Sequence, residues 1–248
     1  MVLLKTVLAF AATIFAMFLF IPVGLPAFIL SFLGLKKPMS WVNYKMAQAW
    51  ARCIIYITGC SMEVKGREHI PKKGSVCFVS NHVGIFDIIL AIGYIGRPFG
   101  FIAKKELAFI PMLDVWIYLL GGLFLDRKNI RKAISTMNRG IQKIKDGGSM
   151  LIFPEGTRSK GRGLGPFKSG SFKLASNSLA PVIPIAIAGS YDVFERHYLV
   201  HAVPVRLVFC PPIVTADMSS DDRRHKLPDQ VRLTIEETLV TRLEENRE

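Results

Sequence analysis

The sequence predicts an α/β fold, in which a mixed, largely parallel sheet is flanked by helices and preceded by two N-terminal helices. Three observations support this prediction. Short apolar runs of strand size recur from residue 76 onward, helical periodicities separate several of them, and the first 35 residues are strongly hydrophobic. We therefore divide the chain into an N-terminal part, residues 1–58, and an α/β domain, residues 59–248.

The N-terminal part begins with a long uncharged stretch. Residues 6–35 carry no formal charge, but Pro22, Gly24 and Pro26 interrupt the run. The uninterrupted portion, residues 6–21, would form a helix of about 24 Å, which is shorter than the roughly 30 Å hydrocarbon core of a bilayer. This stretch is therefore expected to enter a membrane without crossing it.

A second helix is expected over residues 38–57. On a helical wheel Lys45, Gln48 and Arg52 fall on one side, and apolar residues fall on the other: Val42, Met46, Ala49, Trp50, Cys53 and Ile57. We expect the two helices to form an anchor that dips into one leaflet from the cytoplasmic side. The alternative is a single tilted helix that spans the bilayer.

Composition limits the possible partners. Half of the residues are apolar, and Lys plus Arg exceed Asp plus Glu by 32 − 19 = 13. A hydrophobic and basic chain favours an anionic membrane surface. Nucleic acid is not expected, because the chain shows no zinc-ligand spacing, no basic heptad helix and no alternation of aromatic and basic residues. The four cysteines form no CxxC pair, which is typical of reduced residues in a cytosolic compartment.

The elements of the α/β domain follow from hydrophobic patterning. Six runs have strand size: residues 76–79, 100–103, 123–125, 150–153, 182–188 and 205–209. One helix is predicted from the stripe Ile130, Ala133, Ile134, Met137, Ile141 and Ile144, and its basic residues are interpreted as a solvated face. A C-terminal helix is predicted from Leu227, Val231, Ile235, Leu239 and Leu243.

A histidine and an aspartate five positions apart form the first candidate site. His82 follows the strand-like residues 75–80, and Gly84 permits a turn before the helical pattern that contains Asp87. Asp87 could accept the proton of one ring nitrogen of His82, fix the tautomer and raise the basicity of the other nitrogen. The spacing alone is a weak signal, and His82 could instead cap the helix or pack in the core.

A basic segment forms the second candidate site. After the strand ending at residue 153, Pro154 stops the ladder, Gly156 lets the backbone approach a ligand, and Arg158 offers a forked donor for phosphate. Glu155 could orient Arg158 and other nearby cations, or it could bind a substrate hydroxyl.

Two other predicted strands also end in basic residues. Lys104 and Lys105 follow residues 100–103, and Arg127 follows residues 123–125. Each is an ordinary surface charge when taken alone. In a parallel sheet, however, these ends share one edge with His82, which predicts an anion-binding pocket there.

Four ordered blocks carry a family resemblance: Asn81-His82-x4-Asp87, GLFLDR at 122–127, FPEGTRS at 153–159 and VIPI at 182–185. Together they resemble the glycerolipid acyltransferase family, and within it the bacterial 1-acylglycerol-3-phosphate acyltransferases. The resemblance covers about residues 60–210. The chain departs from the pattern at Gly84, where many members carry Ser or another polar residue.

The resemblance implies transfer of a fatty acyl group from a thioester to the sn-2 hydroxyl of 1-acylglycerol-3-phosphate (lysophosphatidate), which gives phosphatidate. His82 would act as the general base, assisted by Asp87. The acceptor would be held by Lys105, Arg127, Glu155, Gly156 and Arg158. No metal or other cofactor is implied; the thioester of acyl carrier protein or of coenzyme A would be a cosubstrate.

Three other functions compete with this interpretation. An acyltransferase that uses glycerol-3-phosphate or another lysophospholipid is the nearest alternative, because these acceptors also carry a phosphate. A noncatalytic module that binds anionic lipids would explain the charge and the anchor without using His82. A metal-dependent hydrolase is disfavoured, because His69, His197, His201 and His225 show no ligand spacing.

Overall fold

The computed structural model describes residues 1–30, 33 and 35–245, apart from the side chains at 36–38, 169 and 241–245. A single sheet runs through this part of the chain, in the strand order β1-β7-β6-β2-β5-β3-β4. Adjacent strands are parallel except for β6 and β7. The strands are β1 (Ser61–Lys65), β2 (Val76–Ser80), β3 (Gly100–Lys104), β4 (Leu123–Leu125), β5 (Ser149–Ile152), β6 (Val182–Ala188) and β7 (Pro204–Phe209).

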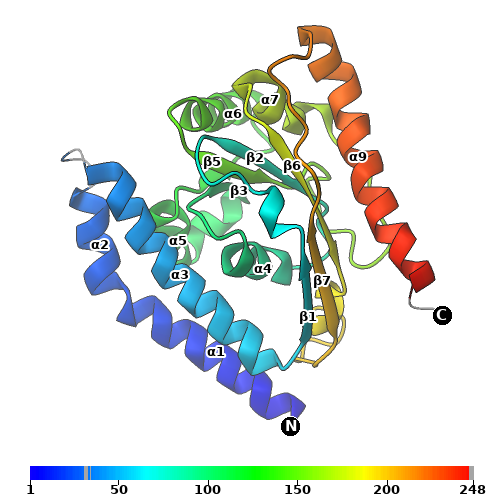
Figure 1. Cartoon of the computed structure of the whole chain (residues 1–248). Helices are drawn as coiled ribbons and strands as arrows, with labels where there is room; N and C mark the ends of the chain where they lie inside the picture. Colours follow the sequence, from blue (N-terminus) through cyan, green and yellow to red (C-terminus); the bar gives the residue numbers. More distant parts are fainter. Residues whose placement is uncertain (31–32, 34, 246–248) are drawn as a thin grey trace.

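Helices cover both faces of the sheet (Figure 1). One face carries α6 (Ile130–Lys145), α7 (Ser169–Ser178) and α9 (Ser220–Glu245), while α4 (Phe86–Tyr94) and α5 (Leu113–Leu119) lie on the other. Outside α4 lies a further layer made of α1 (Val2–Leu19), α2 (Ile21–Leu30) and α3 (Lys36–Thr58). The remaining helical segments are short: α8 (Ser190–Val193), η2 (Arg67–His69) and η3 (Lys105–Phe109).

The predicted α/β class is confirmed. All six expected strands form, each with ends within one residue of the prediction. They were visible in the sequence because the central strands are covered on both faces, so their residues form nearly continuous apolar runs. All five residues of β2 are buried, for example. The edge strand β1 was not predicted, because its sequence SMEVK carries two charges and none of its residues is fully buried.

The two predicted helices of the domain are present, with one correction. In α6 the side chains of Met137, Ile141 and Ile144 are buried, but Ile130 and Ile134 are 76% and 49% exposed, so the buried stripe is shorter than expected. In α9 three residues of the stripe have no exposed area: Leu227, Val231 and Ile235. Leu243 lies outside the described side chains.

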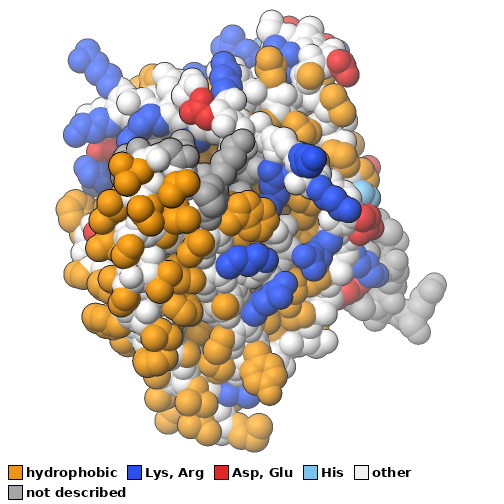
Figure 2. All heavy atoms as spheres, turned by 60° about the vertical axis from the view of Figure 1, so that its left-hand side comes forward, with side chains coloured by type: hydrophobic (Ala, Val, Ile, Leu, Met, Phe, Trp, Pro, Cys, Tyr) orange, Lys and Arg blue, Asp and Glu red, His pale blue; other side chains and the backbone are white. Residues whose placement is uncertain are grey.

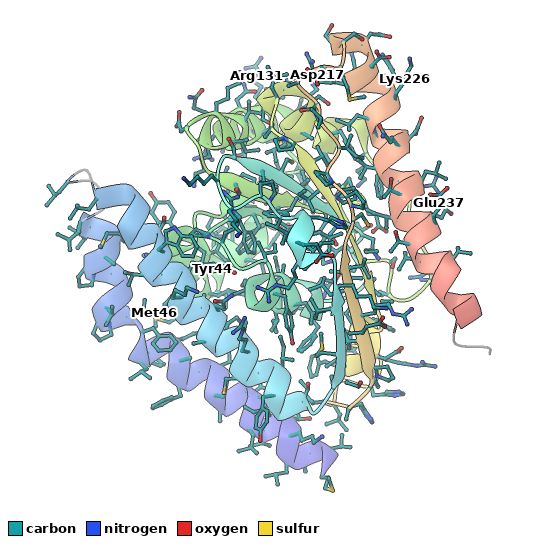
Figure 3. The ribbon with its side chains drawn as sticks, viewed as in Figure 1. Tyr44, Met46, Arg131, Asp217, Lys226 and Glu237 are labelled. Carbon is teal, nitrogen blue, oxygen red and sulfur yellow. The ribbon has the colours of Figure 1, made fainter. Side chains whose placement is uncertain are left out.

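The first expected N-terminal helix, residues 6–21, corresponds to α1, which ends at a bend at Phe20. The stretch that contains Pro22, Gly24 and Pro26 was expected to interrupt the helix, but it forms a further helix, α2. The second expected helix, α3, packs against α1 and α2 as well as against α4. Figure 3 shows Tyr44 pointing from α3 toward α4 and Met46 pointing toward α2. Helix α3 therefore connects the apolar N-terminal layer to the α/β domain.

The expected polar face of α3 lies only partly in solvent: Lys45 and Arg52 are exposed, but Gln48 is buried. Gln48 is only 6% exposed, and its Nε2 donates to the carbonyl oxygen of Gly93 in α4 (3.2 Å). Buried Tyr44 donates to Ile92 O (3.1 Å) and accepts from Gly96 N (2.8 Å). The wheel assignment was wrong for Gln48, because α3 has protein neighbours on two sides and uses polar side chains to bind the carboxyl end of α4.

Helix α1 lies along the rest of the molecule and is bonded to it near both ends. Near its start, Lys5 Nζ donates to Thr58 O (3.0 Å), and Val200 N donates to Thr6 Oγ1 (2.8 Å). Near its end, Met17 O accepts from Trp116 Nε1 (3.3 Å). These contacts fix the orientation of α1 relative to the domain.

The outer side of α1 and α2 is an extensive apolar surface (Figure 2). Helix α1 has a mean hydropathy of 2.2 over 18 residues, and by length and composition it could cross a membrane. The exposed large side chains of this surface are Leu3, Leu4, Val7, Leu8, Phe10, Ile14, Phe15, Phe18, Leu19, Val23, Leu25 and Ile29. A contiguous patch of this kind marks a membrane-associating surface.

Candidate active site

The predicted polar residues meet at one edge of the sheet. Strands β2, β5, β3 and β4 are adjacent and parallel in this order, so their carboxyl ends lie side by side. His82 follows β2, residues 153–159 follow β5, Lys105 follows β3 and Arg127 follows β4. The prediction of a shared edge is confirmed. The same order places Lys105 two strands and Arg127 three strands from His82, or roughly 10 and 14 Å at about 4.8 Å per strand.

His82 and Asp87 are in direct contact across a turn. The chain turns between the end of β2 and the start of α4, which brings His82 Nδ1 to 2.7 Å from Asp87 Oδ2. A continuous helix would have placed the two residues about 140° apart. With the Nδ1 proton held by the carboxylate, Nε2 carries the lone pair and can accept a proton. The His82 side chain is 21% exposed, whereas that of Asp87 is fully buried.

The buried Asp87 carboxylate is surrounded by hydrogen-bond donors. Besides His82, its Oδ2 accepts from the backbone N–H groups of Val83 (2.7 Å) and Gly84 (3.0 Å). Its Oδ1 accepts from the hydroxyl of Ser190, at the start of α8 (2.5 Å). Four donors thus stabilise the negative charge and fix the carboxylate against the imidazole.

Glu155 has a different position from the one expected. It is 4% exposed, its Oε1 accepts from the backbone N–H of His82 (2.6 Å), and its Oε2 accepts from that of Gly165 (2.9 Å). Burial raises the pKa of the Glu155 carboxyl, while these two hydrogen bonds act in the opposite direction. Glu155 therefore braces the loop after β5 against the turn that carries His82, and its contact with the acceptor stays a prediction.

Further contacts hold this loop and the turn together. The backbone N–H groups of Ser159 and Lys160 donate to the carbonyl oxygens of His82 (2.7 Å) and Val83 (3.1 Å). The ring of Phe153 stacks on the imidazole of His82, with centroids 4.1 Å apart and planes at 21°. Three kinds of contact therefore set the orientation of His82: hydrogen bonds to its backbone, stacking on its ring and the hydrogen bond at Nδ1.

The predicted cations have partners or neighbours of their own. Arg158 Nη1 pairs with Glu195 Oε1 (2.5 Å), and Lys105 Nζ pairs with Asp126 Oδ2 (2.8 Å), which lowers the pKa of Asp126. Arg127 is exposed. Gly156 has φ +69°, and a Cβ there would lie 3.1 Å from Lys168 Nζ. Glycine at this position therefore permits the turn and the close approach of a further cation.

A second basic region adjoins Lys105. A pocket of about 260 Å³ is lined by Lys105, Phe124, Asp126, Lys132, Ser135, Thr136 and Arg139. Lys132 and Arg139 belong to the face of α6 that the sequence indicated to be solvated. Both are exposed, but they also line this pocket, so the edge of the sheet is more basic than the motif residues alone suggested.

Two neighbours of the site were missed from the sequence, Ser190 and Glu195, and Asn81 was placed in the first motif block without a role. The side chain of Asn81 exchanges two 2.8 Å hydrogen bonds with the backbone of Ile187 in β6. Ser190 and Glu195 follow the carboxyl end of β6, which is parallel to β2. The rule that located the other residues, inspection of the carboxyl ends of parallel strands, would also have pointed to this segment.

The fold and the site together define an acyltransferase: an imidazole–carboxylate pair and a cationic loop lie at the carboxyl edge of a mostly parallel sheet. The family model described as acyltransferase matches residues 61–188, and the chain belongs to this family. It is thus an enzyme of the O-acyltransferase class, which sets aside the noncatalytic lipid-binding module.

Several relatives of the chain are named 1-acyl-sn-glycerol-3-phosphate acyltransferases. The chain is 27% identical over 200 residues to the 1-acyl-sn-glycerol-3-phosphate acyltransferase of Borreliella burgdorferi, a match that covers 81% of this chain and 80% of the relative. For the Haemophilus influenzae enzyme of the same name the identity is 31%, covering 66% and 68%. A longer chloroplastic enzyme of this name from Brassica napus is 31% identical, covering 77% of this chain and 56% of the relative.

A crystal structure shows the same architecture. The 1-acyl-sn-glycerophosphate acyltransferase PlsC from Thermotoga maritima superimposes with a TM-score of 0.76 at 27% identity. The match covers 96% of this chain and 97% of the other, so it includes the N-terminal helices.

The first prediction concerns Ser190. Ser190→Ala removes one of the four donors to Asp87, and a hydrogen bond to a charged group contributes about 1.5–3 kcal/mol. We expect kcat for acyl transfer to fall about tenfold, with little change in the KM of the acceptor. Ser176→Ala is the matched control, because the Ser176 hydroxyl donates to backbone oxygens of Phe172 and Arg223, away from the site. Equal losses in both variants would contradict the assignment.

Proposed function

We propose that this protein transfers a fatty acyl group from an acyl thioester to the sn-2 hydroxyl of lysophosphatidate and so produces phosphatidate for phospholipid synthesis. The observation that carries the proposal is the contact between His82 and Asp87 beside the braced, cationic loop after β5. The relatives described above bear the name of this activity.

The geometry supports a direct transfer with His82 as general base. Asp87 holds the proton on Nδ1, so Nε2 can remove the proton of the acceptor hydroxyl while its oxygen attacks the thioester carbonyl. The new C–O bond gives a tetrahedral intermediate. Its collapse breaks the C–S bond, and the thiolate receives the proton from the imidazolium that Asp87 stabilises. A thiol with a pKa of about 8.5 is a good leaving group, so no covalent enzyme intermediate is required.

The acceptor phosphate is proposed to bind along the cationic edge. Arg158 is the principal ligand, since its guanidinium is planar and permanently charged, with several donors for phosphate oxygens. Lys105 and Arg127 extend the positive charge along the same edge, and Gly156 shapes the loop. Glu155 takes part by holding this loop against His82.

The donor is proposed to be the thioester of acyl carrier protein or of coenzyme A, bound as a cosubstrate and not as a resident cofactor. Both carriers are anionic, and the chain has a formal net charge of +13.

Residues 1–58 are proposed to hold the enzyme in the cytoplasmic leaflet of the cell membrane, next to the domain formed by residues 59–248. Helix α1 is about 27 Å long at ~1.5 Å per residue. In a spanning arrangement its first turn would lie across the bilayer from the domain. Lys5 and Thr6 are instead bonded to Thr58 and Val200, which favours a helix that lies in one leaflet. The exposed apolar side chains would enter lipid, and the basic surface would attract anionic headgroups.

Replacement of the general base gives the central test. His82→Ala should lower the rate by about 10³, within the range of about 10²–10⁴ for general-base contributions. The assay supplies lysophosphatidate and an acyl thioester and measures both free thiol and phosphatidate. His225→Ala, which changes an exposed histidine on α9, should retain the parent rate. Preferential acylation of glycerol-3-phosphate when both acceptors are present would contradict the proposed substrate.

Arg158 should act mainly on the acceptor. Arg158→Ala is expected to raise the KM of lysophosphatidate roughly 10- to 100-fold, as for the loss of a charge-assisted hydrogen bond of about 1.5–3 kcal/mol. Arg196→Ala is the matched control, because Arg196 is also exposed and paired with a carboxylate, that of Asp192. An unchanged KM in Arg158→Ala would show that the phosphate binds elsewhere.

The membrane arrangement can be tested by protease protection. In sealed vesicles with the cytoplasmic face outward, a tag before Met1 should be cleaved by added protease, because both ends of α1 stay on the side of the domain. A tag at the C-terminus controls for vesicle orientation and should be cleaved to the same extent. Protection of the N-terminal tag alone would indicate a spanning helix.

A further inference from the structure

Glu195 lies outside every sequence motif but contacts two of them. It follows α8, and its side chain is only 13% exposed. Its Oε1 accepts from Arg158 Nη1 (2.5 Å), and its Oε2 accepts from the backbone N–H of Ile85, in the turn between His82 and α4. One carboxylate thus joins the segment after β6 to both halves of the site.

We propose that Glu195 is a positioning residue, which holds the guanidinium of Arg158 where the acceptor phosphate binds. The inference rests on the proposed function, because it assigns Glu195 a role in binding that acceptor. Arg158 belongs to an exposed loop and has a long, flexible side chain. Fixing the side chain before the acceptor arrives removes part of the entropic cost of binding.

The arrangement leaves Arg158 able to bind a further anion. A guanidinium has five N–H donors, and Glu195 contacts Nη1. Within the described residues, no other hydrogen bond or ion pair engages the Arg158 side chain, which is 40% exposed. Its remaining donors are therefore available to phosphate oxygens. Glu195 is itself fixed by Ile85 N–H, at the N-terminus of α4, where the helix dipole favours a negative charge.

Gly84 provides the space that Glu195 occupies. A Cβ at residue 84 would lie 2.8 Å from Glu195 Oε2 and 3.1 Å from Tyr191 Cα. Any side chain at this position would therefore displace the carboxylate or the start of α8. The glycine in the catalytic turn and the glutamate after α8 form a matched pair, which explains why the carboxylate can reach Ile85 N–H.

The test is a double-mutant cycle on the KM of lysophosphatidate. Glu195→Ala should raise this KM about fivefold to tenfold, a coupling of the size seen for residues in one ion-pair network, with a smaller change in kcat. In the Arg158→Ala background the same substitution should change KM less than about twofold, because the group that Glu195 positions is absent. Asp192→Ala is the control: it removes a more exposed carboxylate from α8, that of the Arg196 ion pair, and should leave KM unchanged.

Several outcomes would overturn the inference. An equal rise in KM in both backgrounds would show that Glu195 acts independently of Arg158. A lower KM in Glu195→Ala would make Glu195 a competitor of the phosphate, and an equal effect of Asp192→Ala would indicate a general charge effect. If a thermal melt shows that Glu195→Ala is not folded, the isosteric Glu195→Gln is measured instead. Its effect on KM is again compared between the parent and Arg158→Ala backgrounds. If the parent protein does not acylate lysophosphatidate, the proposed function itself is refuted. Failure of the proposed function is thereby distinguished from failure of the role assigned to Glu195.

Discussion

The structure of the site depends on one buried carboxylate, that of Asp87. A fully buried negative charge is costly unless hydrogen bonds replace its water. Here the donors come from the imidazole, from two backbone groups of the preceding turn and from the hydroxyl of Ser190 after β6. Satisfying this charge therefore fixes the turn after β2 and the start of α8 together. The orientation of the His82 imidazole is a consequence of how the protein supplies hydrogen-bond donors to the carboxylate.

The loop after β5 shows how a single motif can contain residues with opposite tasks. Glu155 is directed inward, where its two oxygens accept hydrogen bonds from the backbone N–H groups of His82 and Gly165. Three positions later Arg158 is directed outward and meets Glu195. Phe153 stacks on the imidazole at the beginning of the same loop. The motif thus combines a ring contact, an internal brace and an external cation, so its members differ in function although they are adjacent in sequence.

Much of the fold and the main residues of the site could be predicted from the sequence. Apolar runs located the central strands, and the convergence of parallel strand ends placed His82, Lys105, Arg127 and Arg158 at one edge. Local patterns could not reveal contacts made at long range. Asp87 and Ser190 are 103 positions apart, and Glu195 reaches a backbone N–H that carries no side-chain signal. Gln48 was misassigned because a helical wheel cannot show that α3 has partners on two sides.

The hydrogen bonds from Lys5 and Thr6 have a consequence for how substrates reach the enzyme. If α1 lies in one leaflet as proposed, its bonds to the domain near both ends would hold the catalytic edge at a constant height above the lipid plane. A lipid acceptor would then arrive by lateral diffusion with its tail in the leaflet, and a water-soluble thioester donor would approach from the aqueous side. Turnover should accordingly follow the mole fraction of acceptor in the bilayer more closely than its bulk concentration.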